Sequence, residues 1–151
     1  MIIERIYLSP ANKSAQIEAV HVDIVAGQGI VGDRHFARND WAGQNLTLVE
    51  AEEIERFCAR EQLPIDLSLS RRNLVTRGIR LNALVGRRFW IGDIELLGVE
   101  LCEPCSSLGK ALASATLSAS EAVKYWTGRC GLRADIIGGG RLQRGATIRL
   151  G

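Results

Sequence analysis

Residues 88–105 read RFWIGDIELLGVELCEPC, and this stretch contains two strand-like runs joined by a short turn. Arg88–Ile91 and Ile94–Leu101 have the apolar and β-branched residues that are typical of strands. Gly92-Asp93 separates them by the two residues of a tight hairpin turn. The second run leads directly into Cys102-Glu103-Pro104-Cys105. We therefore expect a β-hairpin whose second strand ends at a segment with two cysteines.

Further strand-like runs occupy residues 2–8, 17–25, 73–76, 132–137 and 147–150. Neither face of 17–25 is cleanly polar, which predicts one strand that is buried on one face and partly covered on the other. The chain has 16 glycines in 151 residues, above the usual ~7%, which indicates many tight turns. This pattern favours a mainly β fold, a closed or nearly closed barrel, over a doubly wound α/β sheet.

A few short helices are also expected. Thr47 and Glu50 have the spacing of a capping box, and Pro64 lies where the first helix should stop. Residues 106–120 are expected to contain one or two helical turns, and Ser118 with Glu121 should cap a short helix that ends near Trp126. The absence of linkers and repeats indicates a single domain over 1–151.

Composition excludes several function classes. The net charge is +2 with a pI near 8.5, and aromatic residues make up 5%, so neither charge nor stacking residues favour a nucleic-acid partner. The chain shows no secretory signal, and its apolar runs are shorter than the roughly 18 residues of a membrane span. We expect a cytoplasmic protein whose four cysteines are thiols or ligands rather than disulfides.

Cys105 is the strongest candidate for chemistry. Pro104 stiffens the strand exit, so the thiol of Cys105 should face a cleft or rim as a thiolate ligand or a nucleophile. A structural zinc site would need two more ligands, and Cys58 and Cys130 stand singly. A thioredoxin-like redox pair would need a βαβ setting. Ordinary packing is the expectation for Cys58 and the simplest one for Cys102.

Several cations could bind an anion. In Gly32-Asp33-Arg34-His35, a glycine loop can bring Arg34 and backbone N–H groups close to an anion, with His35 as a further donor. A turn with solvated charges explains the same residues equally well. His21 lies in an apolar run and is expected to be a hydrogen-bonded core residue.

Arg71-Arg72-Asn73 precedes a predicted strand. Adjacent side chains of an extended chain point to opposite faces, so only one of the two arginines should face a shared pocket. A guanidinium suits bidentate phosphate binding, and Asn73 could hold the edge of a polar heterocycle. A surface charge pair is the alternative, and Lys13-Ser14 is ambiguous in the same way. Arg129, beside Cys130, is a further cation.

In their order along the chain, these segments resemble the successive motifs of the MOSC family, named for the C-terminal domain of molybdenum cofactor sulfurases. They are GIVGDRH (29–35), NLTLVE (45–50), RNLVTRG (72–78), LVG (84–86), CEPC (102–105) and GLRA (131–134). The resemblance extends from Ser9 to about Gly140 and points to the short stand-alone bacterial branch.

The resemblance implies a MOSC-type β-barrel and a molybdenum–molybdopterin cofactor. It implies that Cys105 ligates molybdenum or carries sulfur, and that Arg72 and Asn73 contact the cofactor. Lys13-Ser14 is similar to a pair that contacts the pterin phosphate in some relatives. The anionic cofactor would give Lys13, Arg34, Arg72 and Arg129 a shared reason to converge, with His35 as a donor beside them.

Two functions follow from the resemblance. The first is a molybdenum-dependent oxidoreductase that reduces N-hydroxylated small molecules with electrons from a partner reductase. The second is a sulfur carrier that receives a Cys105 persulfide from a cysteine desulfurase. A metal-free or zinc-stabilised binding module is the alternative to both. The chain departs from many members at residues 143–146, where a Gly-Asp pair is missing, and at 125–128, which leaves the substrate open.

Overall fold

The hairpin expected from residues 88–101 is present in the computed structural model, which describes residues 1–12 and 14–151. β7 (Arg88–Ile91) pairs antiparallel with β8 (Ile94–Leu101), and Ile91 lies opposite Ile94 across the turn. Positive φ at Gly92 allows the chain to reverse there. β8 continues the sheet by pairing with β9 (Leu132–Gly138).

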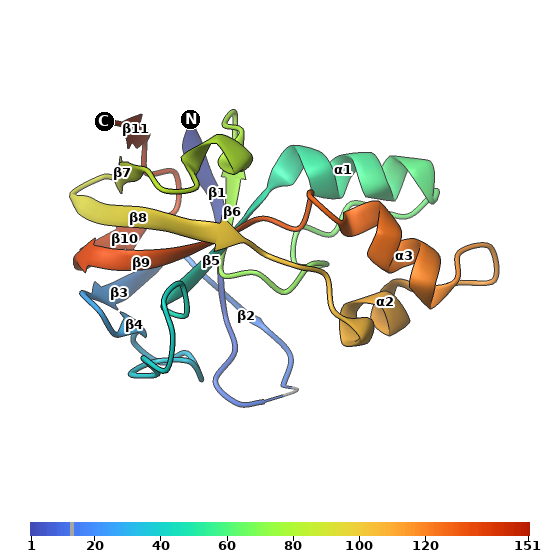
Figure 1. Ribbon diagram of the computed structural model, residues 1–151, viewed down its shortest axis with the longest axis horizontal. Coiled ribbons are helices and arrows are strands. Elements are labelled where there is room, and N and C mark those ends of the chain that lie inside the picture. Colours follow the sequence, from blue (N-terminus) through green and yellow to red (C-terminus); the bar gives the residue numbers. More distant parts are fainter. Residues whose placement is uncertain (13) are drawn as a thin grey trace.

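The strands form a large and a small sheet, and the helices gather at one end of the strands (Figure 1). Strands make up 36% and helices 19% of the chain, so the mainly β prediction is confirmed. The large sheet has the order β11 (Ile148–Leu150), β7, β8, β9, β5 (Leu46–Glu50), β6 (Leu74–Arg77), β1 (Ile2–Leu8) and β2 (Ile17–Ala19). The small sheet has the order β10 (Gly140–Gln143), β3 (His21–Val25) and β4 (Gly29–Ile30).

A closed barrel is not found, because both sheets are open over the described residues. The first and last segments of the chain nevertheless approach each other through one isolated bridge between Ile2 and Thr147. The Ile148 N–H donates to Met1 O and the Ile3 N–H donates to Ala146 O, both at 2.9 Å. The pairing there is too short to make β1 a ladder partner of β11.

The run 17–25 forms two strands in different sheets instead of one. The break is at Val20, whose carbonyl accepts a hydrogen bond from the Arg144 N–H at 2.8 Å. In β3 the alternation buries Val22 and Ile24, so His21 is exposed and the prediction of a buried His21 is wrong.

The first helix, α1 (Ala51–Arg60), starts later than the sequence suggests. Thr47 and Glu50 lie in β5, which is central between β6 and β9, and Glu50 makes no side-chain cap. Both side chains are used in long-range contacts: Thr47 bonds to Asn73, and Glu50 accepts from the Leu81 N–H at 3.2 Å. Sheet pairing has therefore overridden the local capping pattern.

The other helical predictions fit better. α2 (Ser106–Leu112) supplies the expected helical turns, and η1 (Leu81–Leu84) is a 3₁₀ turn. α3 (Ala119–Trp126) has the predicted capping box, in which Ser118 Oγ accepts from the Glu121 N–H at 3.1 Å and Glu121 Oε1 accepts from the Ser118 N–H at 3.0 Å. None of the described helices has both the length and the apolar character needed to cross a membrane.

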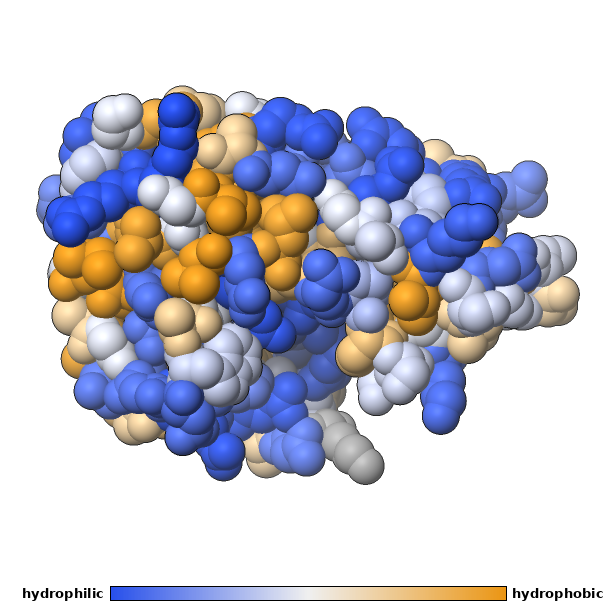
Figure 2. Space-filling view, in the orientation of Figure 1, coloured by the Kyte–Doolittle hydropathy of each residue, from blue (hydrophilic) through white to orange (hydrophobic). Residues whose placement is uncertain are grey.

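The described residues form two hydrophobic cores. One fills the space between the two sheets and contains Phe89 and Leu132. The other lies between the large sheet and the helices, where Phe57 packs against Trp126 with ring centroids 5.3 Å apart. The space-filling view shows hydrophilic residues around a recess between the strand-rich part and the helices (Figure 2). This recess lies at the boundary between the two packed regions.

Gly131 provides a test of this packing. Its φ is +100°, and a Cβ at this position would lie 1.8 Å from Leu48 O in β5. We expect Gly131→Ala to lower the free energy of unfolding by at least about 3 kcal/mol in urea titrations. Gly86→Ala is the matched control, because Gly86 has φ +76° but no atom near its Cβ position, and it should cost only about 1–2 kcal/mol. Equal losses in the two variants would contradict the close approach.

Candidate functional site

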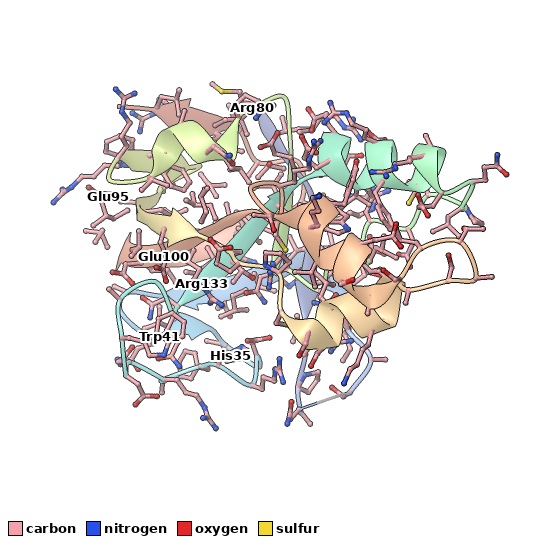
Figure 3. All side chains as sticks on the ribbon, turned by 45° about the vertical axis from the view of Figure 1, so that its right-hand side comes forward. His35, Trp41, Arg80, Glu95, Glu100 and Arg133 are labelled. Atoms are coloured by element: carbon pink, nitrogen blue, oxygen red, sulfur yellow. The ribbon has the colours of Figure 1, made fainter. Side chains whose placement is uncertain are left out.

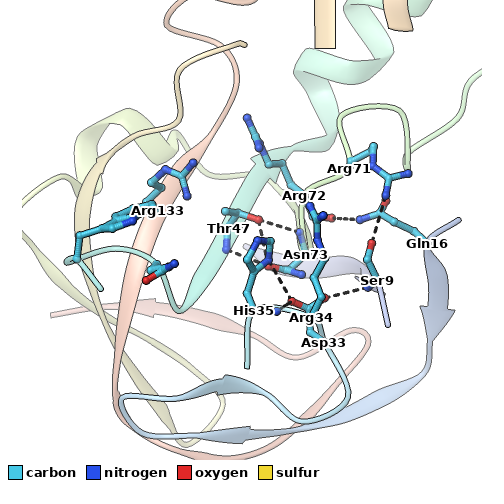
Figure 4. Close-up of a pocket in the computed structure, with 12 residues that line it drawn as sticks. Ser9, Gln16, Asp33, Arg34, His35, Thr47, Arg71, Arg72, Asn73 and Arg133 are labelled. Carbon is cyan, nitrogen blue, oxygen red and sulfur yellow. Dashed lines mark hydrogen bonds and ion pairs between the residues drawn. The ribbon is translucent and has the colours of Figure 1, made fainter. Parts of the chain in front are cut away.

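A hollow of about 210 Å³ collects many of the polar residues that the sequence singled out (Figure 4). We call it the arginine hollow, because four arginines line it. Its lining residues are Ser9, Gln16, Asp33, Arg34, His35, Trp41, Gln44, Thr47, Arg71, Arg72, Asn73 and Arg133. Asp33 is the one carboxylate among them, so the hollow carries a clear excess of positive charge.

Asp33 uses its charge to hold the loop that carries Arg34 and His35. Its Oδ1 accepts from the Ser9 N–H at 2.8 Å, and its Oδ2 accepts from the His35 N–H at 3.2 Å and lies 3.4 Å from His35 Nδ1. Burial acts to raise the pKa of Asp33, but the hydrogen bonds from His35 and Ser9 outweigh it and lower the pKa. The carboxylate is therefore ionised at neutral pH and directed at its own loop.

Asn73 is buried and connects three strands. Its Oδ1 accepts from the Thr47 N–H at 3.2 Å and from Thr47 Oγ1 at 3.1 Å, and its Nδ2 donates to Tyr7 O at 3.3 Å. Most of the hydrogen-bonding capacity of the amide is thus used inside the protein. A ligand in the hollow could receive the second Nδ2 hydrogen, which is a smaller role than the sequence suggested.

Arg71 and Arg72 both line the arginine hollow, so the expectation that only one of them faces a shared pocket is wrong. Arg71 has a φ of +58°, and β6 starts only at Leu74, so the alternation of an extended chain does not apply to this pair. Arg71 Nη2 donates to Ser14 O at 2.8 Å. Arg72 turns toward Cys130, where Nε donates to the carbonyl at 3.1 Å.

Cys105 lines a second hollow of about 270 Å³, which we call the cysteine hollow. The thiol residue is exposed and directly precedes α2. Arg34, Arg71, Arg72 and Arg133 line this hollow as well as the arginine hollow. The fold therefore brings one accessible sulfur and four guanidinium groups together from four separate segments of the chain.

The other cysteines are buried. Burial raises the pKa of the Cys102 thiol, although Arg72 and Arg133 act to lower it, so Cys102 remains protonated at neutral pH. Burial acts to lower the pKa of Arg72, but the sulfurs of Cys102, Cys130 and Cys105 nearby outweigh it and raise the pKa. Arg72 is therefore a permanent cation beside three sulfur atoms.

Two residues expected at the site, Arg129 and Ser14, do not place their side chains in it. Arg129 lies over the Tyr125 ring, 4.8 Å from its centroid, and 3.7 Å from Glu53, in a different hollow. The Ser14 hydroxyl donates to Ala11 O at 2.7 Å, and only its carbonyl reaches the site through Arg71. Lys13 lies outside the described residues.

Sequence reasoning missed Arg133 as a site residue. It lies between the buried residues Leu132 and Ala134 of β9, so the two-residue period of a strand places it on the opposite face. That signal was available in the sequence. Its guanidinium stacks over the ring of Trp41, 4.8 Å from the centroid, and both residues lie on the same side of the molecule (Figure 3). Trp41, in a loop without a pattern, gave no such signal.

Within residues 1–12 and 14–151, no three His, Cys, Asp or Glu side chains form a metal-binding group. What the described site offers a ligand is one exposed thiol beside several guanidinium donors. Guanidinium groups bind phosphate and carboxylate oxygens bidentately, and thiolates bind soft metals. This donor set fits an anionic group that brings most of the ligands of its own metal.

Comparisons with known proteins agree with the fold. The model of the MOSC domain family matches residues 21–149. No curated protein matches the chain. Among solved structures, the YUAD protein from Bacillus subtilis is 22% identical, with a TM-score of 0.82 over 97% of this chain and 93% of its own. YiiM from Geobacillus stearothermophilus is 14% identical, with a TM-score of 0.72 over 99% and 74%. YiiM from Escherichia coli is 16% identical, with a TM-score of 0.68 over 100% and 70%.

The Asp33 contacts predict a pH-dependent stability. Because folding lowers the pKa of Asp33, its contribution is present above the unfolded value of about 3.9 and is lost as the pH falls through the folded value. We expect Asp33→Asn to lower the free energy of unfolding by about 1–3 kcal/mol at pH 7 and by less at pH 3. Urea titrations at several pH values measure this. A loss of the same size at both pH values would show that ionisation is not the cause.

Proposed function

Because the chain belongs to the MOSC domain family, we propose that it binds a molybdenum–molybdopterin cofactor across the arginine and cysteine hollows. The family is associated with this cofactor. The observation that carries the proposal is the sharing of Arg34, Arg71, Arg72 and Arg133 between the two hollows, with the exposed Cys105 in one of them. The cofactor has anionic and sulfur-rich parts, which match these two kinds of donor.

The arginines are the proposed holders of the pterin phosphate. Their forks of N–H donors match phosphate oxygens, and the partly buried position of Arg72 strengthens such a contact, because less water competes for it. His35 turns Nδ1 to Asp33, which leaves Nε2 as the ring nitrogen for a ligand. Asn73 contributes its second Nδ2 hydrogen. Arg129 and the Ser14 side chain have no part in this arrangement.

Cys105 is the proposed sulfur ligand of molybdenum. It follows Pro104 at the end of β8, where the fixed φ of proline limits the movement of the chain. Thiolate sulfur is a soft ligand, and soft ligands select metals of this kind. When bound, the cofactor would supply two-electron oxygen-atom chemistry, while the protein residues orient it and hold its charge.

We propose that the reaction is the reduction of an N-hydroxylated small molecule. In this reaction the N–O bond breaks, and R–NHOH takes up two electrons and two protons to give R–NH₂ and water. A partner reductase would deliver the electrons. Glu103 also lines the cysteine hollow.

The exposure of Cys105 supports a second candidate function, a sulfur carrier for cofactor sulfuration. In that role the Cys105 thiolate would attack the persulfide of a cysteine desulfurase. The S–S bond of the donor would break, the donor would leave as a thiolate, and Cys105 would keep the outer sulfur as its own persulfide. Both candidate functions need the same accessible sulfur, so the structure alone does not distinguish them. An experiment that identifies the product formed at Cys105 does.

The ligand role of Cys105 is tested by Cys105→Ser. We expect the variant, purified anaerobically beside the wild type, to lose molybdenum by at least about tenfold, because the serine hydroxyl is a poorer ligand for this metal. Lys110→Ala, an exposed change on the neighbouring helix α2, is the control and should keep the metal. Elemental analysis by mass spectrometry is the measurement. Equal molybdenum in the serine variant and the wild type would remove Cys105 from this role.

The oxidoreductase and carrier functions predict different products at Cys105. For an oxidoreductase, incubation with a cysteine desulfurase and free cysteine should leave Cys105 unmodified, and the protein should reduce an N-hydroxylated compound when a reductase is supplied. For a carrier, peptide mass spectrometry should find Cys105 heavier by one sulfur atom, without that activity. Cys58, which is buried, is the internal control peptide. A persulfide on Cys105 with no reduction would favour the carrier.

A further inference from the structure

We propose that Cys130 is a positioning residue that fixes the Arg72 guanidinium for phosphate binding in the arginine hollow. The inference deepens the proposed function and rests on it for the identity of the phosphate-bearing ligand. The sequence left Cys130 without a role, since it stands alone and has no neighbouring cysteine at short spacing. Its contacts in the structure give it one.

Cys130 holds Arg72 at two points. The Arg72 Nε donates to the Cys130 carbonyl at 3.1 Å, and Arg72 Nη2 donates to Cys130 Sγ at 2.9 Å. Two contacts from one residue to two nitrogens of one planar group fix both the position and the plane of the guanidinium. They leave the remaining N–H donors of the fork for another acceptor. Because Arg72 lines both hollows, these donors lie where a ligand in either hollow can reach them.

Cys130 is itself held rigidly. Its side chain is fully buried in the core between the large sheet and the helices. The next residue, Gly131, packs closely against the backbone of β5 and accepts a hydrogen bond from the Cys102 N–H at 2.8 Å. β9 begins directly afterwards and pairs with both β5 and β8. The position of Arg72 is therefore set by the core of the protein.

Arg34 and Arg71 are held differently. Arg34 donates to the side chain of Asn12, and Arg71 donates to Ser14 O and to Ser9 Oγ, all on the segment after β1. Asn12 is exposed, so water competes with it for the hydrogen bond from Arg34. Arg71 reaches one buried residue, Ser9, through a single long contact of 3.4 Å, whereas Arg72 is held at two nitrogens by the fully buried Cys130. A preorganised guanidinium binds a tetrahedral oxyanion at a lower entropic cost than a mobile one. Arg72 is thus the fixed point of the phosphate site.

The test measures binding of inorganic phosphate to the full chain by isothermal titration calorimetry. We expect Cys130→Ala to weaken phosphate binding about 5- to 10-fold, since a hydrogen bond that orients Arg72 is lost. Cys130→Ser should stay within about twofold of the wild type, because a hydroxyl also accepts from a guanidinium. Cys130→Val, which keeps bulk without a strong acceptor, should behave as the alanine variant does.

Two controls separate positioning from a general loss of stability. Cys58→Ala removes a sulfur that is buried in the same core, so it should lower the melting temperature but leave phosphate affinity unchanged. In an Arg72→Ala background, Cys130→Ala should have no further effect on phosphate affinity, because Cys130 acts through Arg72.

Three results would overturn the proposal. The first is equal phosphate affinity in the wild type and Cys130→Ala, and the second is no measurable phosphate binding to the wild type. The third is a loss of phosphate affinity on Cys130→Ala that persists in the Arg72→Ala background. These outcomes are independent of the proposed function. The expected series of affinities can be found in a protein that carries no pterin. Conversely, a chain that holds molybdenum and pterin but binds phosphate equally well after Cys130→Ala would contradict the role of Cys130 and leave the proposed function unaffected.

Discussion

Four guanidinium groups of like charge share the space beside Cys105, and their mutual repulsion is the constraint on which the site depends. Each is held by its own partner: Arg34 by Asn12, Arg71 by Ser14, Arg72 by Cys130 and Arg133 by the ring of Trp41. The nearby Asp33 turns its charge to its own loop, and Glu103 is the one carboxylate among the residues that line the cysteine hollow, so positive charge remains in excess there. Such an arrangement is best stabilised by an anionic ligand.

The fold provides this convergence through the ends of its strands. Ser9 follows β1, Arg72 precedes β6, Cys102 follows β8 and Cys130 precedes β9. The strands themselves are fixed by apolar packing on both sides of the large sheet, so the segments at their ends have little freedom to separate. The two cores therefore make the site rigid. Its polar residues lose little conformational entropy when they take up their positions, because the strands on either side already fix the backbone.

Local patterns predicted the fold wherever local and tertiary forces agree. The hairpin turn at Gly92 and the capping box at Ser118 depend on residues a few positions apart, and both are present. Thr47 has a capping pattern too, but its place in a central strand decides its conformation. The run 17–25 was misread because a change of sheet at Val20 leaves no mark in the alternation of residue types.

Parts of the candidate site were predictable as well, namely those that depend on patterns of neighbouring residues. The exposed position of Cys105 follows from a strand exit stiffened by proline, and Arg133 could have been found from strand alternation. The partnership of Arg72 with Cys130 joins residues 58 positions apart, and no local pattern contains it. The positive φ of Arg71 is equally hidden, although it decides that both adjacent arginines face the same hollow.

The most direct test of the central claim is the molybdenum and pterin content of the wild-type chain, coexpressed with cofactor biosynthesis and purified gently without oxygen. A cofactor bound across the two hollows predicts close to one molybdenum and one pterin, detected as its fluorescent oxidised form, per chain. Protein that is folded and binds phosphate, yet carries neither molybdenum nor pterin under these conditions, would contradict the claim.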